Sequence, residues 1–424
     1  MSGAGTYVCA FAGRRDYYQL PLALSEAGLL DSFITDAYYG GLARWSARFM
    51  PEHLARKMQF RFDAGLRQDR IICLWRNVIE GRVRERLGFA DWHTFATLDR
   101  RLSIAAAARA RRNRCHLFLY QPYAWEAFTA KYAHEPRKIL FQFHPHADLE
   151  RRILREDAER HPVFRHSYEE EMGDHVSQAV KQRNRDCWRH ADLILCASEF
   201  TKYSLVEAGA DPKICKRVAY GIDLPDLPLE TRSNESFHVL FVGSGTQRKG
   251  LHHLLMAWRM AALPPDSRLT LVCRAIDPGL ESMLRTVPKV RLLRGVDAAT
   301  LEQMFRTGTL FAMPSLVEGF GQVYLEALAQ GCPVLGTPNS CLPDLGPSDA
   351  VHMVQAGAID ELTARLEQLA RMLPGDIRFR KEARACAARW PWTQFRHGVI
   401  SALRLPISSR HSYLGDGSAL AHSA

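Results

Sequence analysis

Short apolar runs alternate with helical patterns along most of the chain. Apolar runs bounded by glycine, proline or polar residues predict buried strands, and apolar residues at helical spacing between them predict helices. Regular alternation of the two favours an α/β fold built on parallel sheets. Strands are expected at 7–11, 31–35, 116–120, 138–143, 191–197, 237–242, 269–273, 290–293, 310–313, 333–336 and 351–354. Helices are expected at 18–27, 150–189, 279–286, 298–307, 323–329, 359–373, 378–389 and 390–403.

The same pattern predicts two domains, and a chain of 424 residues is long enough to bury a core in each. Between them, prolines and polar residues break the alternation, which is typical of a linker. The end of the chain is rich in Ser, Gly and Ala, which favours disorder. The expected segments are a first domain at 1–224, a linker at 225–236, a second domain at 237–390, a helical segment at 391–406 and a disordered tail at 407–424.

The stretch 310–336 carries the most specific chemistry. It predicts a strand, a loop, a helix and a second strand, a unit that places its loop at the carboxyl edge of a parallel sheet, where such sheets bind ligands. Gly319 and Gly321 let the backbone approach a ligand, and the helix start offers free N–H groups to a diphosphate. Glu318 and Glu326 suit sugar hydroxyls, because carboxylates only accept hydrogen bonds. A solvated loop carboxylate and a helix-face glutamate remain the alternative.

The segment from Glu318 to Val334 resembles the EGFG-x-x-x-LEA-x-A-x-G-x-PV signature of retaining glycosyltransferases of family 4. The resemblance implies a GT-B fold, in which two Rossmann-like domains face each other across a cleft, and a metal-independent transfer from a nucleotide diphosphate sugar. It implies that Glu318 contacts the donor sugar and Glu326 the ribose. The backbone N–H groups that would meet the sugar and the phosphates belong to Phe320, Gly321, Gln322 and Val323, and Gly319 is a further donor-binding candidate. It also implies that the helix in 391–406 crosses back to the first domain.

A second loop, from Gly243 to Gly250, follows a predicted strand. It fits neither the dinucleotide fingerprint, because the third glycine comes too late, nor the P-loop, because Leu251 follows the last glycine. It resembles the family's G-R-x-x-x-x-K-G loop, whose Arg and Lys neutralise the leaving diphosphate. Lys249 matches the lysine, but Ser244 stands in place of the arginine. Arg248 is long enough to take its place.

Because Ser244 stands where the family has an arginine, more than one function is compatible with the sequence. Losing one cationic contact to developing charge costs on the order of 3 kcal/mol of transition-state stabilisation. The chain is therefore interpreted either as an active glycosyltransferase or as a non-catalytic GT-B protein that binds a nucleotide or glycan. A sugar-nucleotide epimerase of the same architecture is a third interpretation.

Two positions of the first domain are further candidates. Gly13 lies in the first predicted βα turn, which the resemblance places beside the donor diphosphate; a tight turn without a ligand is the alternative. His144 follows a predicted strand, and the resemblance places such a histidine near the anomeric carbon, with His146 in reserve. A capping or packing role for His144 stays open. No further ligand cluster lies nearby in sequence and no D-x-D motif occurs, so neither a metal nor another cofactor is expected.

Charge adds one partner hypothesis. The net charge is +10, and the window 41–115 holds 17 Lys/Arg against 7 Asp/Glu, a difference of +10. Aromatic residues such as Trp45 and Trp75 lie among these arginines, which suits an anionic membrane surface or glycan; ordinary solvated helices are the alternative. No nucleic-acid module accompanies the charge, so nucleic acid is not expected.

The remaining features concern location. No apolar run is long enough to span a membrane, no signal peptide is evident, and ten scattered cysteines suggest no disulfide framework. A cytoplasmic protein is expected, in peripheral contact with the inner face of the plasma membrane. The acceptor is expected to be a glycan or a lipid-linked glycan, in polysaccharide or glycolipid assembly.

Overall fold

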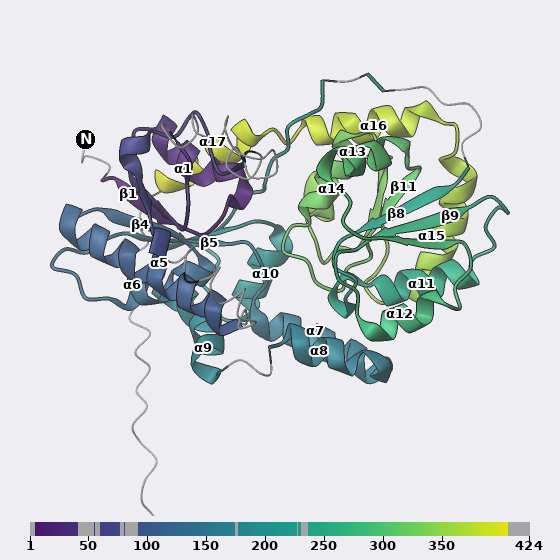
Figure 1. Ribbon diagram of the computed structural model, residues 1–424, viewed down its shortest axis with the longest axis horizontal. Helices are drawn as coiled ribbons and strands as arrows, with labels where there is room; N and C mark the ends of the chain where they lie inside the picture. The colour runs from purple at the N-terminus through teal and green to yellow at the C-terminus, as the bar shows by residue number, and fades with distance from the viewer. Residues whose placement is uncertain are drawn as a thin grey trace, which may run out of the picture.

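The computed structural model consists of two α/β domains, each built on a parallel sheet (Figure 1). It describes residues 5–40, 55, 60–76, 80, 92–173, 177–226, 228–229 and 236–405. The predicted tail 407–424, most of the predicted linker and much of the basic window 41–115 lie outside the described residues. The predicted α/β GT-B fold is confirmed by these two sheets and by the structural comparisons reported below.

The N-terminal sheet has seven parallel strands in the order β3-β2-β1-β4-β5-β6-β7. Its central strands are buried along their whole length, because helices cover both faces, and this explains their continuous apolar runs. The strands are β1 Tyr7–Ala10, β2 Leu30–Thr35, β3 Ile71–Cys73, β4 His116–Tyr120, β5 Lys138–Gln142, β6 Leu193–Cys196 and β7 Cys215–Arg217. The sequence pattern missed β3 and β7, which are short edge strands with mixed polarity.

The helices of this domain include α1 Gln19–Glu26, α5 Trp92–Asn113, α6 Trp125–Thr129, α7 Ala147–Arg160, α8 Arg165–Glu171, α9 Gln178–Asp186 and α10 Glu199–Glu207. The segment 150–189, predicted to be helical, divides into α7, α8 and α9. Pro162 cannot continue the hydrogen-bond pattern of α7, and a 3₁₀ turn at Pro162–Phe164 separates α7 from α8. Gly173, with φ of +58°, follows the end of α8.

The C-terminal sheet has six parallel strands in the order β10-β9-β8-β11-β12-β13. They are β8 His238–Val242, β9 Arg268–Val272, β10 Val290–Leu293, β11 Leu310–Ala312, β12 Val334–Gly336 and β13 Val351–Met353. The helices are α11 Leu251–Met260, α12 Pro278–Leu284, α13 Ala298–Thr307, α14 Gln322–Ala329, α15 Ile359–Met372 and α16 Ile377–Ala388. Every predicted strand of this half is confirmed to within two residues, since the apolar runs and their glycine and proline boundaries agree.

Two segments cross between the domains. Helix α17 (Trp392–Leu403) lies beside α1 in Figure 1, and Nε of Arg396 is 2.9 Å from Oε2 of Glu26. In the other direction, α7 and α8 extend from the N-terminal domain towards α11 and α12 (Figure 1). Nε2 of Gln247, at the start of the second domain, donates to the carbonyl of Leu154 on α7 at 2.9 Å. The loop after β11 thereby lies against the segment that follows β5 in the other domain.

Candidate active site

The loop after β11 touches the end of β5 in the other domain. A β-carbon added to Gly319 would lie 1.9 Å from the carbonyl oxygen of Phe143 and 3.0 Å from Cα of His144. Only glycine permits this approach. The hydroxyl of Thr201, at the start of α10, donates to the carbonyl of Gly319 at 3.0 Å. Gly319 was expected to approach a ligand, and in the structure its missing side chain serves the contact between the two domains.

Glu318 is buried beside Gly319 and faces two cations from the other predicted loop. Nζ of Lys249 donates to Oε2 of Glu318, and NH1 of Arg248 lies 3.7 Å from the same oxygen. Burial opposes ionisation of the carboxyl, but the charges of Lys249 and Arg248 outweigh it and lower the pKa of Glu318 to about 2. Burial lowers the pKa of Lys249, against the effect of the facing carboxylate. The two predicted loops therefore meet in one buried ion pair.

Arg248 connects this pair to the N-terminal domain. Its Nε donates to Oε1 of Glu171 on α8 at 2.6 Å and lies 4.0 Å from Oε1 of Glu150 on α7. Nε2 of His144 is 2.9 Å from the same Glu150 oxygen. The structure thus brings the four residues predicted as catalytic, His144, Arg248, Lys249 and Glu318, into one network. Sequence reasoning missed Glu150 and Glu171, because they lie in a charged helical stretch that resembles a solvated face.

Glu326 and Ser244 lie apart from this network. The carboxyl of Glu326 makes no hydrogen bond or ion pair to any residue that the structure describes, and burial, with the nearby charge of Glu302, raises its pKa. Its carboxyl is therefore available to a ligand hydroxyl. Ser244 is exposed, next to Gly243 with φ of +153°, and supplies no cation.

The rest of the signature loop packs against the first domain. The ring of Phe320 lies 5.3 Å from that of Tyr220, and Nε2 of Gln322 donates to the carbonyl of Gly221 at 2.7 Å. Gly321, with φ of +85°, precedes the first residue of α14, and Val323 in the first turn is half-buried. The side chains of Phe320 and Gln322 therefore position the loop, while the N-terminus of α14 retains the dipole expected to favour a diphosphate.

The turn after β1 contains Gly13 and the cation Arg15. The N–H of Gly13, which has φ of +80°, donates to Oδ1 of Asp36 at 2.8 Å and so is occupied. Arg15 lies over the Phe143 ring, 4.3 Å from its centroid, and its buried Nε has no partner among the described residues. The residues Asp16, Tyr17 and Tyr18 all have positive φ, a strained backbone of the kind found at functional sites. Arg15 is a cation that the sequence reasoning passed over, although it adjoins Gly13.

His146, the reserve candidate, has a structural role. Its Nδ1 accepts from the N–H of Asp148 at 3.3 Å, which caps α7, and its Nε2 is 3.1 Å from the carbonyl of Arg185. Burial lowers its pKa. His144 is the histidine of this pair that reaches the ion-pair network.

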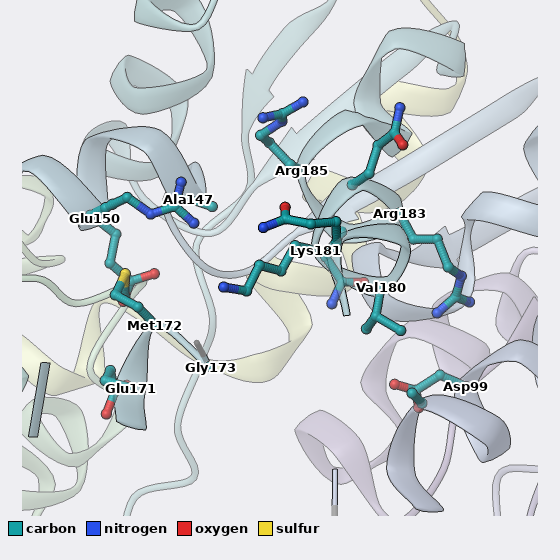
Figure 2. A pocket seen from close by; sticks show the side chains of 15 residues that line it. Asp99, Ala147, Glu150, Glu171, Met172, Gly173, Val180, Lys181, Arg183 and Arg185 are labelled. Atoms are coloured by element: carbon teal, nitrogen blue, oxygen red, sulfur yellow. The ribbon is translucent and has the colours of Figure 1, made fainter. Parts of the chain in front are cut away.

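A cavity of about 420 Å³ lies in the N-terminal domain, next to the ion-pair network of Arg248 and Glu318 (Figure 2). Glu150 and Glu171 form one side of it, and Lys181, Arg183 and Arg185 of α9 form the other. Nε and NH2 of Arg183 donate to Glu126 at 2.8 and 2.7 Å, which holds the Arg183 side chain in place along the cavity. Asp99 also lines the cavity, and burial raises its pKa to about 7. The cavity is lined by both polar and apolar side chains, carries both signs of charge and adjoins Arg248 through the two glutamates.

This chain is similar to known proteins in sequence and in fold. The sequence model of the family Glycosyl transferases group 1 matches residues 236–372, the segment that contains both loops of the ion pair. This part of the chain is therefore similar to that family, in agreement with the resemblance seen in the sequence. Within the described residues, no helix is both long and apolar enough to cross a bilayer.

Individual relatives are distant. The MMP α-(1→4)-mannosyltransferase of Mycolicibacterium hassiacum is 26% identical over 197 residues, 45% of this chain and 48% of that protein. The O-antigen chain mannosyltransferase B of Escherichia coli is 24% identical over 196 residues, 42% of this chain and 51% of that protein. The chain spans about half the length of these curated relatives. The crystal structure of Anabaena HepE with UDP and glucose superposes with a TM-score of 0.60 at 14% identity, over 94% of this chain and 99% of that one, and so supports the fold.

Proposed function

We propose that this protein is a retaining, metal-independent glycosyltransferase that moves a sugar from a nucleotide diphosphate sugar to a hydroxyl group of a glycan or lipid-linked acceptor. The observation that carries the proposal is the buried contact of Lys249 with Glu318, made by two loops of the family-matched domain and joined to His144 of the other domain. The named relatives are mannosyltransferases, and the HepE structure holds UDP and glucose, which supports a nucleotide-sugar donor.

In the proposed reaction, the bond between the anomeric carbon and the diphosphate oxygen breaks, and a bond to the acceptor oxygen forms on the same face of the sugar. The acceptor proton passes to the leaving diphosphate. Lys249, Arg248 and the N-terminus of α14 would stabilise the developing negative charge. Glu318 would hold the donor sugar, Glu326 the ribose, and His144 would line the reaction centre.

The cavity beside Glu150 and Glu171 supports an acceptor site in the N-terminal domain. It adjoins His144 through Glu150, so an acceptor hydroxyl at its inner end would face the donor side of the network. Its carboxylates and cations can bind a polyhydroxyl acceptor by hydrogen bonds. A cytoplasmic location, with the basic window 41–115 on an anionic membrane, remains part of the proposal; flotation with anionic but not neutral liposomes would be expected.

Donor binding is the first test. A thermal-shift panel of UDP, GDP, ADP and TDP sugars should show stabilisation by one base, since a ligand at about 100 times its Kd adds roughly 2.7 kcal/mol to the free energy of unfolding. Incubation of that donor with candidate glycans should give a product whose anomeric proton, followed by NMR, retains the donor configuration. An inverted product would contradict retention, and a cooperative melt with no shift for any donor would contradict the proposal.

A non-catalytic binding protein is the second candidate, favoured by the exposed Ser244. The variant Ser244→Arg separates the two. If Arg248 and Lys249 already neutralise the diphosphate, the variant should change kcat by no more than a few-fold. A gain of about a hundredfold or more, the effect of one cationic contact, would indicate a degenerate site.

A further inference from the structure

A cluster of one aspartate and three histidines lies outside the candidate active site. Asp157 and His161 come from the end of α7, and His252 and His253 come from the first turn of α11. One ligand atom from each residue lies within 4.8 Å of every other. Asp157, His252 and His253 are buried, and His161 is half-buried. The cluster therefore joins the two domains and is reached from solvent at His161.

The local structure explains why these residues converge. Asp157 and His161 are four positions apart at the end of α7, a spacing that places two side chains on one face. His252 and His253 follow Gly250, whose φ of +66° turns the chain into α11. A β-carbon on Gly250 would lie 1.9 Å from the carbonyl of Pro314, so the direction of this turn is fixed by the packing of the loop.

The contacts within the cluster leave several buried polar atoms without hydrogen bonds. Nε2 of His253 lies 2.9 Å from Oδ1 of Asp157, yet neither atom has a hydrogen-bond partner among the described residues. Nδ1 of His252 and Nδ1 of His253 are also buried without a partner. Buried polar groups in proteins are nearly always hydrogen-bonded, so the unpartnered Nε2 of His253 and Oδ1 of Asp157, which face each other, indicate a missing partner.

We propose that Asp157, His161, His252 and His253 bind a divalent transition-metal ion, of which Zn²⁺ fits best. Imidazole nitrogens and carboxylate oxygens, which these residues supply, are common zinc ligands. Tetrahedral zinc with bonds of roughly 2.0–2.1 Å needs its ligand atoms about 3.3 Å apart. The carboxylate contacts to His252 and His253, at 3.0 and 2.9 Å, are close to that spacing. His161 completes the set, because its ligand atom lies within 4.8 Å of those of the other three residues.

The surroundings suit a structural metal. Nε2 of Gln247 donates to Oδ2 of Asp157 at 2.7 Å, so the carboxylate is oriented from outside the cluster as metal ligands commonly are. Four protein ligands leave no open position for substrate or water, which is typical of structural zinc sites. The ion would link α7, which carries Glu150 two turns earlier, to the residues directly after Lys249. It would thereby hold the two halves of the candidate active site together.

Metal binding can be tested independently of glycosyl transfer. Tag-free full-length protein, freed of metal by a chelator, is titrated with Zn²⁺ against a chromophoric competitor and, separately, with Co²⁺. We expect one ion per chain and the visible absorption bands of a tetrahedral cobalt site. We also expect Zn²⁺ to raise the Tm of the metal-free protein by several degrees.

Matched variants locate the site. His161→Ala and His253→Ala should each weaken Zn²⁺ binding by more than about tenfold and abolish the Tm increase, since even outer partners of metal ligands contribute 10–100-fold. His166→Ala, which removes an exposed histidine of the neighbouring α8, should bind as the unmodified protein does. His161 is half-buried, so its variant is expected to fold even where His253→Ala does not. Absence of stoichiometric binding, or equal binding by His161→Ala, would overturn the proposal and leave the cluster as an internal polar network.

Discussion

The backbone of Gly319 lies against the carbonyl oxygen of Phe143, with no room for a β-carbon between them. Gly319 belongs to the family-matched domain and Phe143 to the end of β5 in the other, so the contact fixes the distance across the candidate active site. Glu318, which precedes Gly319, and His144, which follows Phe143, are held on either side of this contact.

Replacing Gly319 by alanine should therefore force the domains apart at this point. We expect kcat/KM to fall by about a hundredfold, while the Tm decreases by only a few degrees, because overpacking typically costs 1–3 kcal/mol. Steady-state kinetics and calorimetry provide the two measurements. Gly398→Ala is the matched control, because a β-carbon added there would lie 3.2 Å from its nearest neighbour, a side-chain carbon of Val218. Wild-type activity of Gly319→Ala would show that the close contact with Phe143 is not needed.

Lys249→Met should lower kcat by roughly a hundredfold or more, because it removes a cation from the position where leaving-group charge develops. Nucleotide affinity should weaken as well. The variant Lys216→Met, on edge strand β7, removes a cation remote from the network and should behave as the unmodified protein. An unchanged kcat in a folded Lys249→Met protein would exclude this lysine from the reaction.

The ionised carboxylate of Glu318 should make the free energy of unfolding depend on pH. Its folded pKa of about 2 lies below its ordinary value of 4.5, so its contribution is complete above pH 4.5 and is lost as the pH falls towards 2. This contribution of Glu318 to the free energy of unfolding is of the order of 3 kcal/mol. Denaturant unfolding at several pH values should show Glu318→Gln less stable near pH 7, with the difference shrinking below about pH 4.5. Glu169→Gln, at an exposed position of α8, should show no such trend; a pH-independent difference for Glu318→Gln would contradict the ion pair.

Glu326→Gln should weaken nucleotide-sugar binding by about tenfold or more, since a hydrogen bond from a ribose hydroxyl to a charged acceptor contributes roughly 1.5–3 kcal/mol. Calorimetric titration measures the Kd directly. Because the carboxyl of Glu326 makes no hydrogen bond or ion pair to a described residue, the Tm of the free protein should change little. Glu302→Gln on α13 removes a nearby exposed carboxylate and serves as control; donor affinity that is equal in both variants would refute the ribose assignment.

The sequence by itself determined the α/β class, nearly every strand of the C-terminal sheet and the two loops that meet at Lys249 and Glu318. These features are local: an apolar run, its glycine boundaries and a short motif depend on neighbouring residues, and the pattern expresses them directly. The division of 150–189 at Pro162 was also readable in principle, but the charged residues around it conceal the break.

Only the tertiary structure decided which distant residues share a site. Glu150 and Glu171 acquire their role through contacts with His144 and Arg248, and His252 lies 95 positions after Asp157. Sequence spacing says nothing about such pairs, because their proximity depends on how α7 and α8 lie against the second domain. The same holds for Gly319, whose missing side chain is explained by Phe143, a residue of the opposite domain. Long-range packing, which no local pattern encodes, joins the two halves of the site.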